Sequence, residues 1–169
     1  MRAIDVRELL ERPGSSRTVH VAEPVAGLRT ELADVPEGAP IEGDLTLQSV
    51  REGIYVSGTV QGRFGMRCAR CLKEFVQGFD VEMAELVPRE ASPEDDYALA
   101  SDLTLDPEPI LRDAVVLEMP FSPLCRPDCL GLCETCGGDR NLGECPGHEA
   151  TDPRWAGLDA LRSDDDEAR

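Results

Sequence analysis

Five of the chain's seven cysteines lie in the run LCRPDCLGLCETCGGDRNLGECPGH, residues 124–148, and this run limits the possible folds more than any other feature. The other two cysteines form the pair Cys68-x2-Cys71, which is separated from Cys125 by 53 residues. Thiols at such short spacing are typical of a disulfide framework, a redox centre or a metal site.

Disulfides are disfavoured by the number of cysteines and by the expected compartment. Seven thiols cannot all pair within one chain. The start, MRAIDVRELLERPG, is charged throughout and lacks the apolar stretch of a secretory signal, so we expect a cytoplasmic protein. Clustered thiols stay reduced there and more often bind metal. No apolar run approaches the roughly 18 residues of a membrane span.

Catalytic uses of these cysteines lack the residues that should accompany them. A thioredoxin-like C-x-x-C opens a helix within a βαβ pattern, and neither CARC nor CETC has that context. A zinc deaminase needs H-x-E followed by P-C-x-x-C, a zinc protease needs H-E-x-x-H, and the sequence has neither. We therefore expect a structural metal, no enzymatic activity and no small-molecule substrate.

Structural zinc fits the cysteine spacing. Both thiolates of a C-x2-C turn can reach one ion, and zinc accepts four such ligands in a tetrahedron without strain. The glycine pair Gly137-Gly138 can supply the positive φ needed after a metal-binding turn. The chain has enough ligands for one or two Zn²⁺ ions, the candidates being Cys68, Cys71, Cys125, Cys129, Cys133, Cys136, Cys145 and His148.

These candidates can be shared between two ions in two ways. In the first, the Cys68-x2-Cys71 pair joins Cys125 and Cys129, and the remaining four ligands form a local site. In the second, the two C-x2-C turns share an ion, as they do in zinc ribbons. The remaining four ligands of the first arrangement are close in sequence, which favours it.

Charge is distributed unevenly along the chain, whose formal net charge is −17. Nine acids and a single arginine lie between Glu82 and Glu108. By contrast, the segment RFGMRCARCLK, residues 63–73, has no acid and four basic residues: Arg63, Arg67, Arg70 and Lys73. This basic segment is either a solvated turn or a contact surface for RNA or a protein partner.

Hydrophobic periodicity predicts strands in the first half and a helix after them. Apolar and polar residues alternate in GDLTLQSV, GIYVSGTVQGRF and FVQGFDVEMAELV, which indicates an antiparallel meander. Gly53 can supply the positive φ of a tight first hairpin, and glycines inside the strands indicate strong twist or bulges. Asp106 and Pro107 then form a typical helix start, and Pro120 ends the helical pattern.

We therefore predict one α+β domain, residues 1–162, with an antiparallel β-sheet or partial barrel, a C-terminal helix, a zinc-knuckle-like cysteine-rich segment and a short closing helix. The predicted parts are a β-rich half (1–87), an acidic loop (88–102), a helix (103–120), a cysteine-rich metal segment (121–150), a closing helix (151–162) and a disordered acidic tail (163–169).

The order of these features resembles the YceD family, the large ribosomal RNA subunit accumulation proteins. The resemblance is carried by C-x-R-C-L at Cys68–Leu72, by P-L-C-x3-C-x-G-L-C-x2-C-G at Pro123–Gly137, and by D-P-R-W-A-x-L-x-x-L at Asp152–Leu161. It extends over nearly the whole chain. Many relatives end the cysteine segment with C-x-C, and in this chain His148 is the candidate for the last ligand.

The resemblance implies a non-enzymatic cytoplasmic factor that supports large-subunit ribosomal RNA accumulation and ribosome biogenesis. Its expected partner is that RNA or its precursor, bound directly or through a ribosomal protein. The alternative is a zinc-stabilised protein-interaction module that does not contact RNA.

Overall fold

The computed structural model describes residues 1–90 and 92–148. The chain separates into two compact units, residues 1–127 and 128–169. The predicted closing helix (151–162) and acidic tail (163–169) lie outside the described residues.

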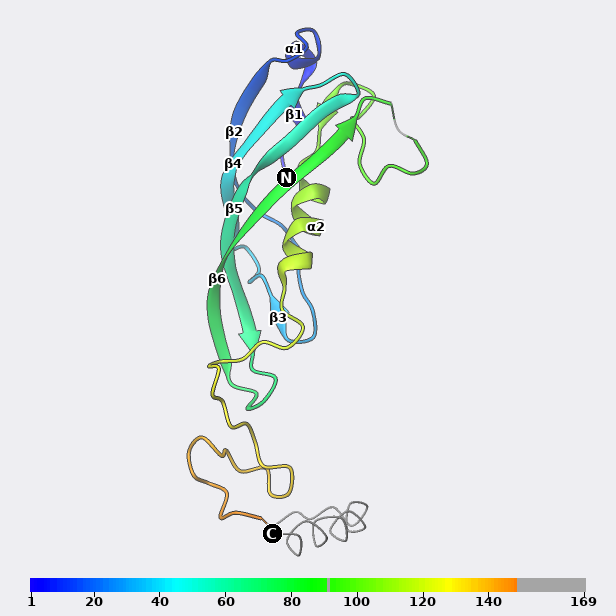
Figure 1. Cartoon of the computed structure of the whole chain (residues 1–169). Helices are drawn as coiled ribbons and strands as arrows, with labels where there is room; N and C mark the ends of the chain where they lie inside the picture. Colours follow the sequence, from blue (N-terminus) through cyan, green and yellow to red (C-terminus); the bar gives the residue numbers. More distant parts are fainter. Residues whose placement is uncertain (91, 149–169) are drawn as a thin grey trace, which may run out of the picture. The chain divides into compact units, whose positions relative to one another are not determined.

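The first unit is built on an antiparallel sheet (Figure 1). Its long strands are β2 (Ser16–Pro24), β4 (Pro40–Ser49), β5 (Gly53–Arg67) and β6 (Glu74–Pro88). One edge of β5 pairs with β4 and then with the short β3 (Ala33–Asp34), and β6 pairs along the whole of β5. The predicted meander is thus confirmed as β4-β5-β6. No pairing joins β2 to β6 in the described part of the chain, so the sheet is open rather than barrel-like.

One face of this sheet carries the hydrophobic core of the unit. The predicted apolar face of β5 is buried, as Ile54, Val56, Val60 and Phe64 are all at most 3% exposed. Helix α2 (Glu108–Glu118) packs against this face through Ile110, Leu111 and Val115 (Figure 1). The opposite face of the sheet is exposed to solvent, and Arg63 and Arg67 near the end of β5 project from it.

The β5–β6 ladder accommodates its glycines without a bulge. Its register is unbroken from the Gly53–Pro88 pair to the Arg67–Glu74 pair, so the bulge offered as one explanation of these glycines is wrong. At Gly62 the missing side chain makes room for a ring: an added Cβ would lie 2.6 Å from Cζ of Phe79. That ring stacks on Phe64 with 4.2 Å between centroids, which explains why a glycine fits in mid-strand.

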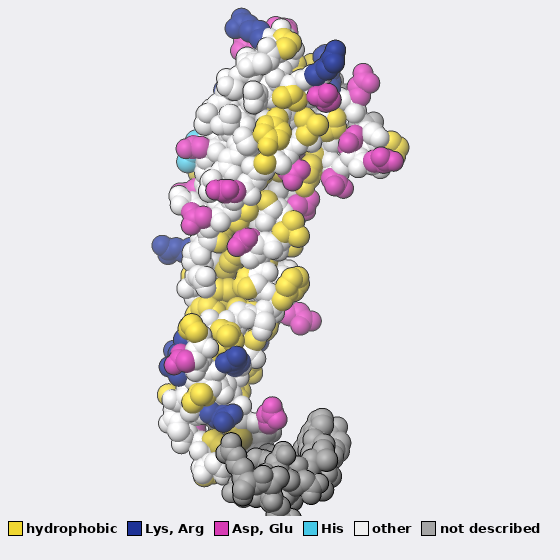
Figure 2. Space-filling view, viewed as in Figure 1, with side chains coloured by type: hydrophobic (Ala, Val, Ile, Leu, Met, Phe, Trp, Pro, Cys, Tyr) yellow, Lys and Arg dark blue, Asp and Glu magenta, His cyan; other side chains and the backbone are white. Residues whose placement is uncertain are grey.

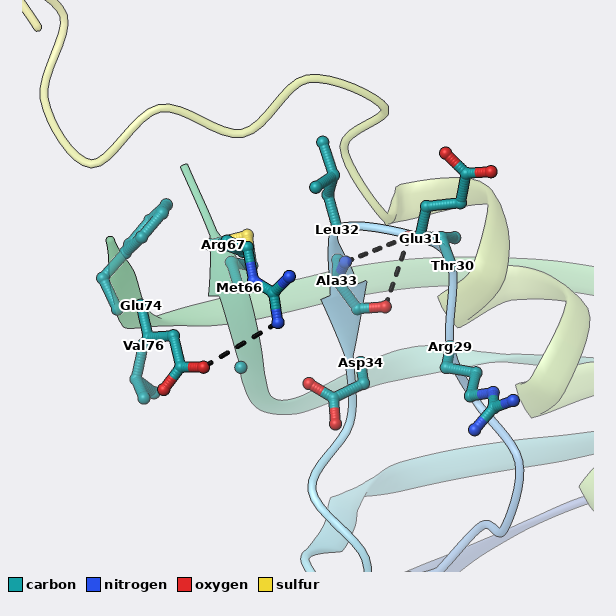
Figure 3. Close-up of a pocket in the computed structure, with 12 residues that line it drawn as sticks. Arg29, Thr30, Glu31, Leu32, Ala33, Asp34, Met66, Arg67, Glu74 and Val76 are labelled. Carbon is teal, nitrogen blue, oxygen red and sulfur yellow. Dashed lines mark hydrogen bonds and ion pairs between the residues drawn. The ribbon is translucent and has the colours of Figure 1, made fainter. Parts of the chain in front are cut away.

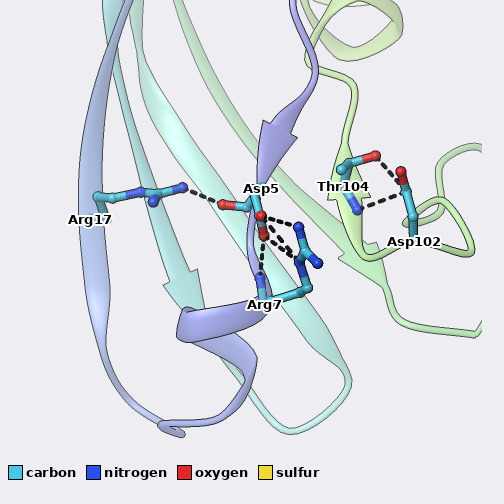
Figure 4. A network of polar contacts seen from close by, with 5 residues as sticks. All are labelled: Asp5, Arg7, Arg17, Asp102 and Thr104. Atoms are coloured by element: carbon cyan, nitrogen blue, oxygen red, sulfur yellow. Dashed lines mark hydrogen bonds and ion pairs between the residues drawn. The ribbon is translucent and has the colours of Figure 1, made fainter.

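A second, two-stranded sheet brings the N-terminal segment to the segment before α2. It pairs β1 (Ile4–Asp5) with β7 (Thr104–Leu105), and the short helix α1 (Arg7–Leu10) follows β1. Figure 4 shows the Arg7 guanidinium and backbone N–H donating to the Asp5 carboxylate. Together these hydrogen bonds lower the pKa of Asp5 to about 2, and the side-chain bond makes the larger contribution.

Helix α2 begins later than predicted. The expected helix over 103–120 is observed as Glu108–Glu118, because Thr104 and Leu105 are extended in β7. The predicted capping residue, Asp106, lies one position before the observed N-cap, Pro107, and its Oδ1 accepts a hydrogen bond from the Glu108 N–H at 3.0 Å. No helix within the described ranges has the length and apolarity needed to cross a membrane.

Candidate metal centres

The Cys68-x2-Cys71 pair lies in a tight turn between β5 and β6. The Cys68 N–H donates to the Lys73 carbonyl, and the Leu72 N–H donates back to the Cys68 carbonyl, both at 2.9 Å. In the second unit, the Cys133-x2-Cys136 turn repeats this pattern. There the Cys133 N–H donates to the Gly138 carbonyl at 2.9 Å, and the Gly137 N–H donates to the Cys133 carbonyl at 2.8 Å. The two C-x2-C motifs therefore fold into the same turn.

Both turns place the residue after the second cysteine in the left-handed region. Gly137 has φ of 72°, which confirms the positive φ predicted there, and Leu72 has φ of 61°. A glycine adopts this conformation freely, whereas a leucine there is strained by its Cβ. The Leu72 side chain is nevertheless 53% exposed, so core packing does not account for its presence.

The first group of candidate ligands gathers at the Cys68 turn. The sulfur atoms of Cys68, Cys71, Cys125 and Cys129 all lie within 4.8 Å of one another. Cys125 is held near the turn by the preceding segment, because the Ala69 N–H donates to the Pro123 carbonyl at 2.8 Å.

The sulfur spacing fits a shared ion better than a disulfide. The Cys71 and Cys125 sulfurs are 3.7 Å apart, far beyond the roughly 2.05 Å of an S–S bond. Two sulfurs bound to one tetrahedral zinc at about 2.3 Å would be about 3.8 Å apart. None of the seven cysteines forms a disulfide in the described part of the chain.

Hydrogen bonds in the first group favour the thiolate form. Burial of Cys68 by itself would raise its pKa, but backbone N–H groups of Cys125, Cys71 and Arg70 donate to its sulfur. These bonds outweigh burial and lower the pKa of Cys68 to about 6. The thiolate is the form that binds metal.

The second group is local and more open to solvent. The ligand atoms of Cys133, Cys136, Cys145 and His148 also lie within 4.8 Å of one another. The backbone N–H groups of Cys136 and Thr135 lower the pKa of Cys133 to about 6. The Cys136 and His148 side chains are exposed. These are the two sets of the first arrangement considered from the sequence, and each set could hold a metal ion.

Asn141 supports the first group and was not found by sequence reasoning. Its side-chain amide donates to Cys129 Sγ at 3.6 Å and to Asp139 Oδ1 at 2.7 Å. Its carbonyl oxygen accepts from the Leu130 N–H at 2.8 Å. Such partners fix the orientation of a ligand. No spacing rule marks an asparagine for this role.

The four basic residues predicted as contacts lie around the same end of β5. Arg63 and Arg67 project from the solvent face of the strand, Arg70 lies in the turn, Lys73 follows it, and all four are exposed. Arg67 is near Glu74, with 4.0 Å between guanidinium nitrogen and carboxylate oxygen. Such an exposed pair at that distance holds the arginine weakly.

A cleft of about 850 Å³ opens beside this end of the sheet, between β3 and the ends of β5 and β6. Figure 3 shows Asp34, Arg67, Glu74 and Val76 around it, with Arg29 at its far side. Its lining therefore mixes both signs of charge with an apolar side chain. Gly65 contributes only backbone to it, and an added Cβ there would lie 2.7 Å from the Asp34 carboxylate.

Comparison with known proteins gives matches over most of the chain. A family model described as large ribosomal RNA subunit accumulation protein YceD matches residues 56–162. An uncharacterized protein of Mycobacterium tuberculosis is 40% identical over 164 residues, which cover 92% of this chain and 78% of the relative. One from Mycobacterium leprae is 34% identical, with 95% and 77% covered. The uncharacterized protein YlbN of Bacillus subtilis is 28% identical, with 65% and 67% covered. No solved structure matches the chain.

Proposed function

This chain belongs to the YceD family, and we propose on that basis that it supports the accumulation of large-subunit ribosomal RNA during ribosome biogenesis. The observation that carries the proposal is the family match over residues 56–162, which contain both C-x2-C turns and all eight candidate ligands. The expected place of action is the bacterial cytoplasm.

We propose that each group of four ligands binds one zinc ion, and that both ions are structural. A set of four thiolates, or of three thiolates and an imidazole, is the donor set that zinc prefers in structural sites. Four protein ligands complete its tetrahedral coordination, so no position remains for a water or a substrate. The protein would therefore act without catalysis of its own.

Under this proposal, the ions keep the end of β5 and the cysteine-rich segment in one conformation. The basic residues beside the Cys68 turn are then held ready to contact ribosomal RNA. A metal-bound turn is well suited to this, because preorganised contacts lose less conformational entropy on binding.

A second candidate function is a zinc-stabilised protein-interaction module that does not contact RNA. It is favoured by the net charge of −17, which repels phosphate over most of the chain. Figure 2 shows acidic side chains spread over the visible face of the molecule. A basic ribosomal protein would be attracted to such a surface.

The proposed function is tested by depletion of the protein in cells, followed by measurement of the ratio of large-subunit to small-subunit ribosomal RNA. We expect a selective fall in the large-subunit RNA that is restored by the wild-type chain. A Cys68→Ser, Cys71→Ser variant should fail to restore it, and the exposed substitution Leu117→Ser serves as a control that should restore it. An unchanged ratio after depletion would refute the proposal.

A further inference from the structure

We infer that one end of the first unit binds an unpaired segment of RNA, with the bases against apolar side chains and the phosphates on the surrounding cations. This inference rests on the proposed function and names the class of RNA and the surface that receives it. The surface, called the turn surface below, consists of Arg63, Arg67, Arg70, Leu72, Lys73 and Val76.

The distribution of charge selects this end for a polyanion. Residues 63–73 contain four cations and no acid, whereas the rest of the chain has 13 basic residues and 34 acids. An RNA strand is therefore repelled from most of the molecule and attracted at the turn surface. Arg63, Arg67 and the residues of the turn are the cations that the phosphates would meet at this end of the first unit.

The conformation of Leu72 points to an apolar contact at the same place. Its position in the turn is equivalent to that of Gly137, and glycine would remove the strain of a positive φ. A strained residue with an exposed side chain is a sign of function rather than of packing. Val76, on β6, is 64% exposed and adds a second apolar side chain to the turn surface.

The cleft in Figure 3 explains why the RNA should be unpaired. It adjoins the turn surface and shares Arg67 and Val76 with it. Its acids, among them Asp34 and Glu74, oppose a phosphate but accept hydrogen bonds from base amino groups. Bases can enter such a site only when they are not stacked in a duplex; unstacked bases commonly stack on guanidinium planes, and apolar side chains can pack against them.

The experiment measures binding of the zinc-loaded full chain to a labelled RNA of about 12 nucleotides without self-complementarity, by fluorescence anisotropy. A duplex of the same sequence serves as the comparison ligand. Four phosphate contacts predict a slope of log K against log salt of about −2.8, or a loss of about 50-fold between about 50 and about 200 mM salt. The duplex should bind at least about tenfold more weakly.

Two variants with matched controls test the named residues. Arg63→Gln, Arg70→Gln should halve the slope to about −1.4, whereas Arg51→Gln, Arg89→Gln makes the same change in net charge at the opposite end of β5 and β6 and should leave it unchanged. Leu72→Gly should weaken binding about fivefold through loss of the apolar contact. It should keep the full zinc content, since Gly137 occupies the equivalent position.

The outcomes separate this inference from the proposed function. Absent binding at low salt, equal affinity for the duplex, or an unaltered affinity in Leu72→Gly would each overturn the inference. If depletion still lowers the large-subunit RNA while a basic peptide binds and RNA does not, the inference fails and the proposed function stands. If unpaired RNA binds as expected but depletion changes nothing, the inference stands and the proposed function fails.

Discussion

Removal of the metal is predicted to occur in two steps, because the two ligand groups differ in exposure. Cys68 and Cys129 are 0% and 1% exposed, whereas Cys136 and His148 are exposed. A chelator or a thiol reagent must reach a ligand atom before it can compete for the ion. The local group should therefore lose its ion first.

The two ligand sets determine how many ions and thiols each step releases. The first step should release one zinc ion and free three thiols, and the second should release one ion and free four. If access to the buried sulfurs requires an opening that costs about 4 kcal/mol, the second step is slower by about 10³-fold. The expected total is two ions and seven thiols per chain.

The assay follows zinc with a colorimetric dye in excess chelator, while aliquots are quenched with a thiol-alkylating reagent and analysed by mass spectrometry. Cys133, Cys136 and Cys145 should be labelled in the first step. A Cys136→Ser variant should remove the fast step and leave the slow one unchanged. Release of both ions in a single step, or early labelling of Cys68, would refute the reasoning.

Three further predictions concern the fold. The lowered pKa of Asp5 stabilises the protein above its ordinary value of 3.8, and that contribution is lost as the pH falls from about 4 to about 2; an NMR titration should find it, and Arg7→Gln should return the pKa toward 3.8. In Gly58→Ala the new Cβ would lie 2.2 Å from a carbonyl oxygen of β4, so the free energy of unfolding should fall by at least about 2 kcal/mol in a urea titration. Gly78→Ala, whose nearest atom lies at 3.8 Å, should cost less than about 1 kcal/mol, and equal losses would contradict this. Asp106→Ala should lower the unfolding free energy by about 1 kcal/mol through loss of the hydrogen bond to the Glu108 N–H at the start of α2, and Asp106→Asn should not.

The long strands were predictable because alternation is a local signal. The apolar residues of β5 show which face of the strand is buried, whatever strands lie beside it. Gly53 was also recognised as part of the first hairpin, but for the wrong reason. Its φ is not among the positive values in the described part of the chain. Glycine is needed there because a Cβ would lie 2.1 Å from the Val87 carbonyl oxygen.

The small sheet and the start of α2 were not predictable in the same way. Two-residue strands have no periodicity, and β1 and β7 pair over a separation of about one hundred residues. Asp106 and Pro107 marked the helix start, but without knowledge of that pairing the predicted range, 103–120, also included the residues of β7. The helix was therefore expected to begin too early.

The sequence identified the eight candidate ligands but left their grouping open. Spacing shows which thiols can share a turn, and only the fold brings Cys125 to Cys68. The sequence also did not show that the two C-x2-C turns have the same backbone conformation. One has leucine where the other has the glycine that the conformation favours.

The contact between the Cys68 turn and the Cys125 segment has a further consequence for the chain between them. An ion held by Cys68, Cys71 and Cys125 would act as a reversible cross-link that closes a loop of more than fifty residues. The acidic loop and α2 both belong to that loop. A protease that cuts the acidic loop would then yield two fragments that stay associated on the ion. Their separation would be governed by chelation as well as by the packing of the sheet.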